Sequence, residues 1–395
     1  MNRNDSVKKA FLVGGISVFS YVSNYVLRNL LSVLTPFMLK ESLYGKEYIA
    51  LLSTCYMIAY AAGQLLNGIL GDRFRAAFMV LTGLSVAGIA SVLFPLLPFR
   101  PFQIFCFLII GYGLSMVRGP LMKLITENTT PDISRIICLF FSFSGFAGPL
   151  IASIISMLFH WDAAFVVTGG ITVFVAFFSF VSIRTLEKKG KISFLPLEGG
   201  GKEAILGVFR VPGFCFYLLI ACLVEIAGTS VTFWIPTFLS EYLRCGEETS
   251  NMIFSGISLV RALVPFCTFA LYRLFGGRDR FLMRICYGIA FLCFAGMLIA
   301  PAGIGTVVLL LTALIMNGFV SALLWSIYIP GLGKTGRVSS INGILDCSGY
   351  IAAGVTTSLF AAVSVSFGSG GLIFAWCVLP VLGLAVTFMG IRKPE

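Results

Sequence analysis

Charged side chains are scarce in this sequence. Asp, Glu, Lys and Arg make up 11% of its 395 residues, whereas a soluble globular domain carries about 25%. Hydrophobic residues make up 58% of the chain, and the mean hydropathy is +0.97. This composition excludes an ordinary soluble domain and predicts an all-α protein that crosses a membrane many times.

Histidine is almost absent, since His160 is the only one. The acidic residues are not clustered, and none of the eleven cysteines belongs to a C-x-x-C pair. Most of the cysteines lie inside apolar runs, where a thiol behaves as a small hydrophobic group. We therefore expect no metal, no cofactor and no enzymatic activity.

Acidic residues are outnumbered, and the net charge is +11. A basic excess can indicate a nucleic-acid partner, but these Lys and Arg residues lie at the ends of apolar runs rather than on one soluble face. We expect no nucleic acid, a lipid bilayer as the surroundings, and a monomer.

Twelve apolar runs long enough to span a bilayer follow one another along the chain. They start near residues 11, 48, 76, 102, 136, 163, 211, 252, 281, 307, 340 and 372. One longer polar segment, with EKKGK and EGGGK elements, separates the first six runs from the last six. We predict an N-terminal six-helix bundle over residues 1–186, a central loop over 187–209 and a C-terminal six-helix bundle over 210–395.

The distribution of Lys and Arg predicts the orientation of these helices. With the N-terminus inside, the outer segments hold only Lys40, Lys46, Arg100 and Arg244, and almost all other basic residues, Lys123 among them, fall in inner segments. Cytoplasmic loops carry the Lys/Arg excess. We expect a cell (inner) membrane protein whose termini and central loop are cytoplasmic.

The first apolar run, residues 11–39, contains an arginine near its centre. An arginine there costs about 2.5–3.5 kcal/mol and rarely faces lipid. Tyr21, Tyr25, Arg28, Ser32 and Thr35 follow at spacings of three or four residues, which places them on one helical face. The pattern indicates a polar stripe that attracts an anion.

Five charges lie inside predicted spans: Arg28, Arg118, Glu225, Arg261 and Asp346. Guanidinium groups bind carboxylate or phosphate through two parallel hydrogen bonds, so arginines suit an anion site. Three arginines against two acids leave one positive charge for an anionic substrate to neutralise.

Each charge also has a structural interpretation. Glu225 and Arg261 could form a salt bridge between consecutive helices, and Asp346 could pair with Arg118. A carboxylate that alternates between an arginine and a proton would instead couple transport to pH, and we favour Glu225 over Asp346 for that role.

Uncharged polar residues also fall on single helical faces. The stripes are Tyr56, Tyr60, Gln64 and Asn67; Asn317, Ser321, Trp325 and Tyr328; and Asn342, Asp346 and Tyr350. They favour a polar translocation path, and the alternative is hydrogen bonding between helices.

The turn between the second and third runs reads Gly68-Ile-Leu-Gly71-Asp72-Arg73-Phe74-Arg75. Its glycines would allow close helix approach, and the acid could accept helix N-terminal N–H groups and pair with Arg73 and Arg75. The turn resembles the G-x-x-x-D-R-x-x-R signature of the major facilitator superfamily, one glycine short. The resemblance implies a gating latch in a twelve-helix fold, in which spans one, four, seven, eight and eleven line the central cavity. The alternative is a basic turn that only fixes topology.

Within that superfamily, Tyr21, Tyr25, Arg28 and Pro36 resemble the first span of the organophosphate:phosphate antiporters. The segment Trp234-Ile-Pro-Thr-Phe-Leu is similar to their W-S-P-T-Y-L motif. Their second substrate arginine corresponds to Gly228 here, and their histidine in span five falls near Ser144. Arginines in spans one and four also resemble the anion:cation symporters that carry sugar acids.

We therefore predict a secondary transporter that moves a small organic anion by alternating access, with phosphate or a proton as the coupling ion. The resemblance implies a sugar phosphate or polyol phosphate as substrate. The alternatives are a proton-coupled carboxylate or sugar-acid symporter and a non-transporting sensor of a phosphorylated sugar. The predicted anion ligands are Arg28, Arg118 and Arg261, with Tyr25, Tyr60, Trp325 and Tyr350 around the rest of the substrate.

Overall fold

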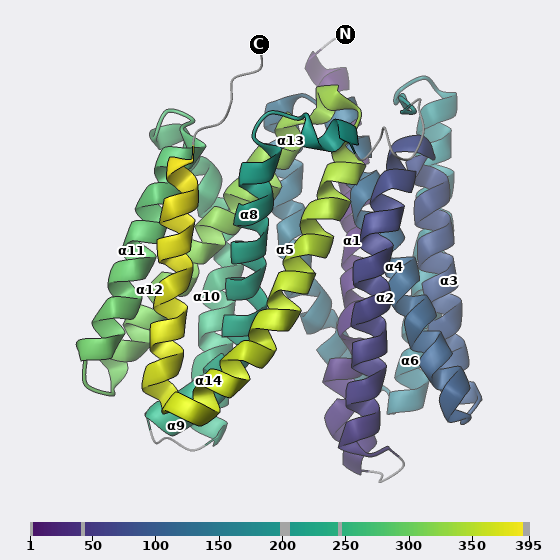
Figure 1. Cartoon of the computed structure of the whole chain (residues 1–395). Coiled ribbons are helices and arrows are strands. Elements are labelled where there is room, and N and C mark those ends of the chain that lie inside the picture. The colour runs from purple at the N-terminus through teal and green to yellow at the C-terminus, as the bar shows by residue number, and fades with distance from the viewer. Residues whose placement is uncertain (1–2, 41–43, 198–205, 244–246, 390–395) are drawn as a thin grey trace. The chain divides into compact units, whose positions relative to one another are not determined.

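The computed structural model describes residues 3–40, 44–197, 206–243 and 247–389. Every regular element within these ranges is helical (Figure 1). The predicted all-α class is therefore confirmed for the described part of the chain.

Six long helices occupy the first half of the sequence. They are α1 (Arg3–Lys40), α2 (Lys46–Arg73), α3 (Ala76–Leu96), α4 (Arg100–Asn128), α5 (Pro131–Leu158) and α6 (Trp161–Lys188). Proline stands in the first turn of α4 and of α5, where its missing N–H breaks no helical hydrogen bond. The short loops that join α2 through α6 match the predicted turns.

The second half contains more irregular helices. The elements are α8 (Phe214–Glu225), η1 (Ile226–Val231), α9 (Thr232–Tyr242), α10 (Glu247–Leu274), α11 (Asp279–Ile299), α12 (Ile304–Ala322), η2 (Leu323–Tyr328), α13 (Ile329–Gly331), η3 (Gly333–Thr335) and α14 (Val338–Phe388). Both η1 and η2 are single π-helical segments inside apolar spans. Such segments are rare and occur frequently at functional sites.

Eleven helical stretches among the described residues are long and apolar enough to cross a membrane. The longest, α14, contains 51 residues and bends at Gly368, where φ is 63° and ψ is −162°. A side chain would be strained at this positive φ, so the glycine permits the bend. The two parts of α14 correspond to the last two of the twelve predicted spans.

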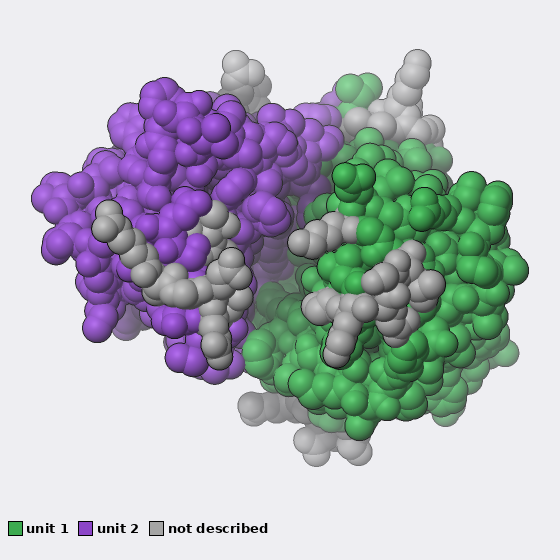
Figure 2. All heavy atoms as spheres, turned by 90° about the horizontal axis from the view of Figure 1, so that it is seen from below, with its two compact units in different colours: residues 1–208, 329–347 green, residues 209–328, 348–395 purple. Residues whose placement is uncertain are grey.

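The chain divides into two compact units (Figure 2). Unit 1 comprises Met1–Val208 and Ile329–Cys347, and unit 2 comprises Phe209–Tyr328 and Ser348–Glu395. The short stretch 329–347, which includes the start of α14, thus groups with the first six helices. The predicted bundle limits of 1–186 and 210–395 remain a prediction, and residues 198–205 of the predicted loop lie outside the described part.

Small residues allow the helices of unit 1 to approach closely. A Cβ atom added to Gly169 of α6 would lie 2.5 Å from the carbonyl oxygen of Gly88 in α3, and one added to Gly88 would lie 2.7 Å from the carbonyl oxygen of Gly169. The two backbones therefore touch where α3 and α6 cross. Such contacts are a main source of helix association in membranes.

Unit 2 has an apolar core formed by α9, α11, α12 and the second part of α14. Its fully buried members include Phe238, Met297, Leu310 and Trp376. The ring of Trp376 meets that of Phe238 at 5.2 Å between centroids. This contact packs α9 against the second part of α14.

Gly169 and Gly170 provide a matched test of the α3–α6 contact. We expect Gly169→Ala to destabilise the protein by about 1–3 kcal/mol, because the added methyl group overpacks the crossing. Gly170→Ala should leave stability unchanged or raise it by up to about 1 kcal/mol, since nothing lies within 4 Å of its added Cβ. Thermal unfolding of the purified variants measures both effects, and equal melting temperatures would contradict the contact.

Candidate functional site

Arg28 of α1 lies close to two tyrosine rings in unit 1. Its guanidinium carbon is 5.4 Å from the ring centroid of Tyr25 and 4.9 Å from that of Tyr60 in α2. The Tyr21 ring meets Tyr25 edge-on at 5.0 Å and stacks on Phe141 of α5 at 4.2 Å. Tyr25 of the predicted stripe and Tyr60 of α2 are therefore near enough to attract the Arg28 guanidinium by cation–π interaction, and Tyr21 packs behind Tyr25.

A cavity of about 390 Å³ opens beside Arg28. Its volume is typical of small-molecule sites. All of its walls come from unit 1, and they consist of Leu27, Arg28, Leu31, Ser32, Thr35, Leu39, Ile49, Ala50, Ser53, Tyr56, Phe107, Ile110 and Phe165. Arg28 is the single charged residue among them, and the hydroxyls of Ser32, Thr35, Ser53 and Tyr56 supply most of the remaining polarity. This composition suits an anionic group bound at one side of an otherwise mostly apolar space.

The hydroxyl of Tyr56 adds a second polar group to this cavity. It is buried and has no hydrogen-bond partner within the described part of the chain. A buried hydroxyl without a protein partner is available to bind a ligand. The sequence placed Tyr56 on a polar stripe but did not include it among the predicted substrate ligands.

Arg118 of α4 and Asp346 of α14 form an ion pair inside unit 1. The Arg118 Nη1 atom lies 2.7 and 2.9 Å from the two carboxylate oxygens of Asp346. Asn342 Nδ2 donates to the same carboxylate at 3.2 Å. The side chains of Arg118 and Asp346 are 13% and 1% exposed. The pair considered from the sequence as the structural alternative is thus present, and an anion at Arg118 would have to compete with Asp346.

Arg261, one of the predicted residues of unit 2, is hydrogen-bonded at the end of the π-helical segment η1. Arg261 of α10 donates from Nη1 to the hydroxyl of Thr232 at 2.8 Å, and Thr232 donates in turn to the carbonyl of Ala227 at 3.2 Å. Gly228, inside η1, has no atom within 4 Å of an added Cβ. The guanidinium of Arg261 is therefore held next to a stretch of η1 that has open space beside it.

Glu225, Trp325 and Tyr350 occupy three different elements of unit 2. Glu225 ends α8, and its Cγ lies 2.5 Å from the position of a Cβ added to Gly349, so α14 packs directly on its side chain. Trp325 lies in η2 and is buried, whereas Tyr350, next to Gly349 in α14, is half-buried. The possible Glu225–Arg261 salt bridge remains a prediction.

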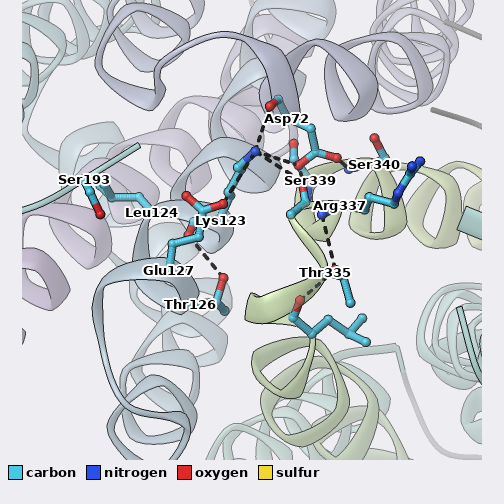
Figure 3. A network of polar contacts seen from close by, with 12 residues as sticks. Asp72, Lys123, Leu124, Thr126, Glu127, Ser193, Thr335, Arg337, Ser339 and Ser340 are labelled. Atoms are coloured by element: carbon cyan, nitrogen blue, oxygen red, sulfur yellow. Dashed lines mark hydrogen bonds and ion pairs between the residues drawn. The ribbon is translucent and has the colours of Figure 1, made fainter. Parts of the chain in front are cut away.

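The C-terminal end of α2 makes the close approach predicted for the glycines of this motif. A Cβ added to Gly68 would lie 2.9 Å from the Cα of Gly343 in α14. The Asp72 carboxylate accepts hydrogen bonds from the backbone N–H groups of Ser339 at 3.0 Å and Ser340 at 2.8 Å, in the first turn of α14 (Figure 3). A carboxylate at a helix N-terminus is stabilised by the helix dipole.

The basic partner of Asp72 differs from the prediction. Lys123 of α4 lies 3.5 Å from the Asp72 carboxylate and donates to the Asp72 carbonyl at 2.7 Å. Arg75 pairs instead with Glu187 of α6 at 3.3 Å. The expected Asp72–Arg75 pair is therefore wrong, because Arg75 lies beyond the end of α2 beside α6. Arg73 ends α2 and is half-buried.

Lys123 was also missed as a buried residue. The sequence predicted a cation in a cytoplasmic segment, but the Lys123 side chain is only 1% exposed. Glu127, one helical turn later, is 2% exposed, and its Oε1 atom lies 3.6 Å from Lys123 Nζ. The spacing of Lys123 and Glu127 on one face of an apolar helix was the available signal.

Comparisons with known proteins agree with this architecture. Residues 17–354 match the Major Facilitator Superfamily. The phosphoglycerate transporter protein of Salmonella typhimurium is 25% identical over 315 residues, which cover 71% of this chain and 67% of that protein.

Two solved structures share the fold. The E. coli fucose:proton symporter superposes with a TM-score of 0.74 at 14% identity, covering 98% of both chains. The proton:xylose symporter XylE superposes with a TM-score of 0.73 at 11% identity, covering 98% of this chain and 97% of that one. These similarities confirm the predicted twelve-helix fold.

Breaking the Arg118–Asp346 pair should be costly. Asp346→Asn leaves a buried guanidinium without its carboxylate, and we expect a loss of about 3–5 kcal/mol. The double variant Arg118→Met/Asp346→Leu should lose much less than the sum of the single substitutions, since an apolar pair replaces both charges. Melting temperatures of the purified single and double variants measure this coupling. Additive losses would show that the two side chains do not interact.

Proposed function

The chain belongs to the Major Facilitator Superfamily and is a multi-pass membrane transporter, and we propose that its substrate is a small organic anion. Arg28 in the cavity of unit 1 carries this proposal. A guanidinium in a membrane-spanning helix is tolerated where it faces a polar space, and its charge attracts a carboxylate or phosphate.

The phosphorylated class is the better supported of the two anion classes. A relative that is 25% identical over most of this chain is named a phosphoglycerate transporter. The first-span residues Tyr21, Tyr25 and Arg28 resemble the organophosphate antiporters. We propose a sugar or polyol phosphate that binds Arg28 and the Tyr56 hydroxyl, exchanged for inorganic phosphate by alternating access.

The remaining predicted ligands complete this proposal in each unit. Arg118 and Arg261 would add positive charge as the substrate moves, and Tyr25 and Tyr60 would keep Arg28 oriented. Trp325 and Tyr350 of unit 2 would contact the rest of the substrate. Asp72 would release the first turn of α14 as the gate opens.

A proton-coupled symporter of a carboxylate is the second candidate, and the Arg118–Asp346 pair favours it. Protonation of Asp346 would free the Arg118 guanidinium for an anion, so that proton and substrate would bind together. Glu225, packed against Gly349, is a further candidate for the proton-carrying group.

We further propose a monomer in the cell (inner) membrane, with both termini on the cytoplasmic side. The distribution of Lys and Arg along the sequence supports this orientation. In that orientation the Asp72 turn faces the cytoplasm.

A ligand panel tests the role of Arg28. We expect glycerol phosphate or phosphoglycerate to raise the melting temperature of the purified protein, whereas hexuronates and dicarboxylates should have less effect. Ligand at 100 times its Kd stabilises the folded state by about 2.7 kcal/mol. The shift should disappear in Arg28→Ala and be reduced in Arg28→Lys, which cannot bind a phosphate through two parallel hydrogen bonds.

Arg100→Ala is the matched control. Arg100 also lies over a tyrosine ring, that of Tyr48 at 5.3 Å, but it does not line the cavity. Its removal should leave the ligand shift intact. A shift that survives in Arg28→Ala would refute the assignment of Arg28.

Flux measurements separate the two coupling modes. In proteoliposomes we expect uptake of the stabilising ligand to require phosphate inside the vesicles and to persist without a pH gradient. Uptake that follows an imposed proton gradient and is abolished in Asp346→Asn or Glu225→Gln would support the symporter instead. Ligand binding without any flux would identify a sensor.

A further inference from the structure

The segment that follows α6 folds back onto unit 1. We call residues 192–197 the strap. Asn128, at the end of α4, donates from Nδ2 to the carbonyl of Ser193 at 3.0 Å and accepts from the Ser193 N–H at 2.9 Å. The Leu197 N–H donates to the Asp72 carbonyl at 2.9 Å. Three hydrogen bonds thus fasten the strap to the ends of α4 and α2.

The strap covers a buried cation. The Nζ atom of Lys123 lies 5.0 Å from the centroid of the Phe194 ring. The same atom donates to the carbonyl of Gly336 at 3.2 Å, just before α14 begins. Lys123 therefore contacts the strap and the residues that lead into α14, in addition to Asp72 of α2 (Figure 3).

Asp72 is the second residue that the strap and α14 share. Its backbone carbonyl accepts from Leu197 in the strap, and its carboxylate accepts from Ser339 and Ser340 in α14. A shift of Asp72 would disturb both sets of hydrogen bonds. Asp72 and Lys123 thus each contact both the strap and the start of α14.

Burial makes this link sensitive to water. The side chains of Lys123, Asp72 and Glu127 are 1%, 0% and 2% exposed. Interactions among buried charges weaken sharply when water enters, because the local dielectric constant rises. Phe194 lies over the ammonium group of Lys123, so its departure would hydrate Lys123 and weaken its attraction for Asp72.

We propose that the strap is part of the latch formed by Asp72 and the first turn of α14. Lys123 is the positioning residue that couples binding of the strap to the hydrogen bonds between Asp72 and that turn. Release of the strap loosens that turn, and release of the turn loosens the strap. The idea that this release accompanies transport rests on the proposed function, whereas the coupling itself does not depend on any substrate.

Hydrogen exchange at backbone amides tests the coupling directly in the purified full-length protein. In Asn128→Ala, which removes both bonds to Ser193, we expect the amides of Ser339 and Ser340 to exchange about tenfold faster. Phe194→Leu removes the ring that covers Lys123 and should have the same effect on exchange at Ser339 and Ser340. This variant replaces Asn128→Ala if that protein does not fold. Ser193→Ala is the control, because Asn128 contacts only the Ser193 backbone.

The outcomes are distinct. Faster exchange confined to residues 192–197, with Ser339 and Ser340 unchanged, would overturn the proposal. Faster exchange throughout the protein, including α3, would also overturn it, since it would indicate general destabilisation. If Asn128→Ala speeds exchange at Ser339 and Ser340 but the protein moves no anion, the strap proposal stands and the proposed transport function is wrong. If the protein moves an anion but exchange at Ser339 and Ser340 does not respond, the transport function stands and the strap proposal is wrong.

Discussion

A charge inside a membrane-spanning bundle needs a partner or access to water, and this requirement organises unit 1. Asp346 is matched by Arg118 and Asn342. Asp72 is matched by two backbone N–H groups and Lys123. Both carboxylates tie the same short stretch of α14 to unit 1. Asp72 binds the first turn of α14, and Asp346 lies in α14 itself, about two turns later. Electrostatic contacts at two levels thus explain why residues 329–347 group with the first six helices rather than with the rest of α14.

Between Asp72 and Asp346, the backbones of α2 and α14 come into direct contact at glycines. Gly68 of α2 faces Gly343 of α14 at a distance that no larger residue would permit. Close backbone contact brings the carboxylate of Asp72 within reach of the α14 amides, and it also excludes water from the polar groups nearby. The glycines and the acid of this turn therefore depend on each other, which gives a physical reason for their joint appearance in one short motif.

Much of this arrangement could be predicted from local patterns. Long apolar runs defined the membrane spans, and the three- to four-residue spacing of Tyr21, Tyr25 and Arg28 placed them together. Partner choice could not be predicted in the same way. Lys123 and Asp72 are 51 positions apart, and Arg75 and Glu187 are 112 apart. From hydropathy alone, a lysine at the end of an apolar run is expected in a loop. The burial of Lys123 follows from the packing of three other chain segments around it.

Arg28 and Arg118, the two predicted anion ligands of unit 1, have chemically different partners, which bears on how they can serve an anion. The rings of Tyr25 and Tyr60 lie 5.4 and 4.9 Å from the Arg28 guanidinium carbon, and a cation–π contact involves the face of a guanidinium rather than its N–H donors. A carboxylate, by contrast, occupies the donors themselves, as Asp346 does at Arg118. The two tyrosine contacts therefore do not compete with an anion for Arg28. At Arg118 an anion does compete with the Asp346 carboxylate, so anion binding there depends on the state of α14.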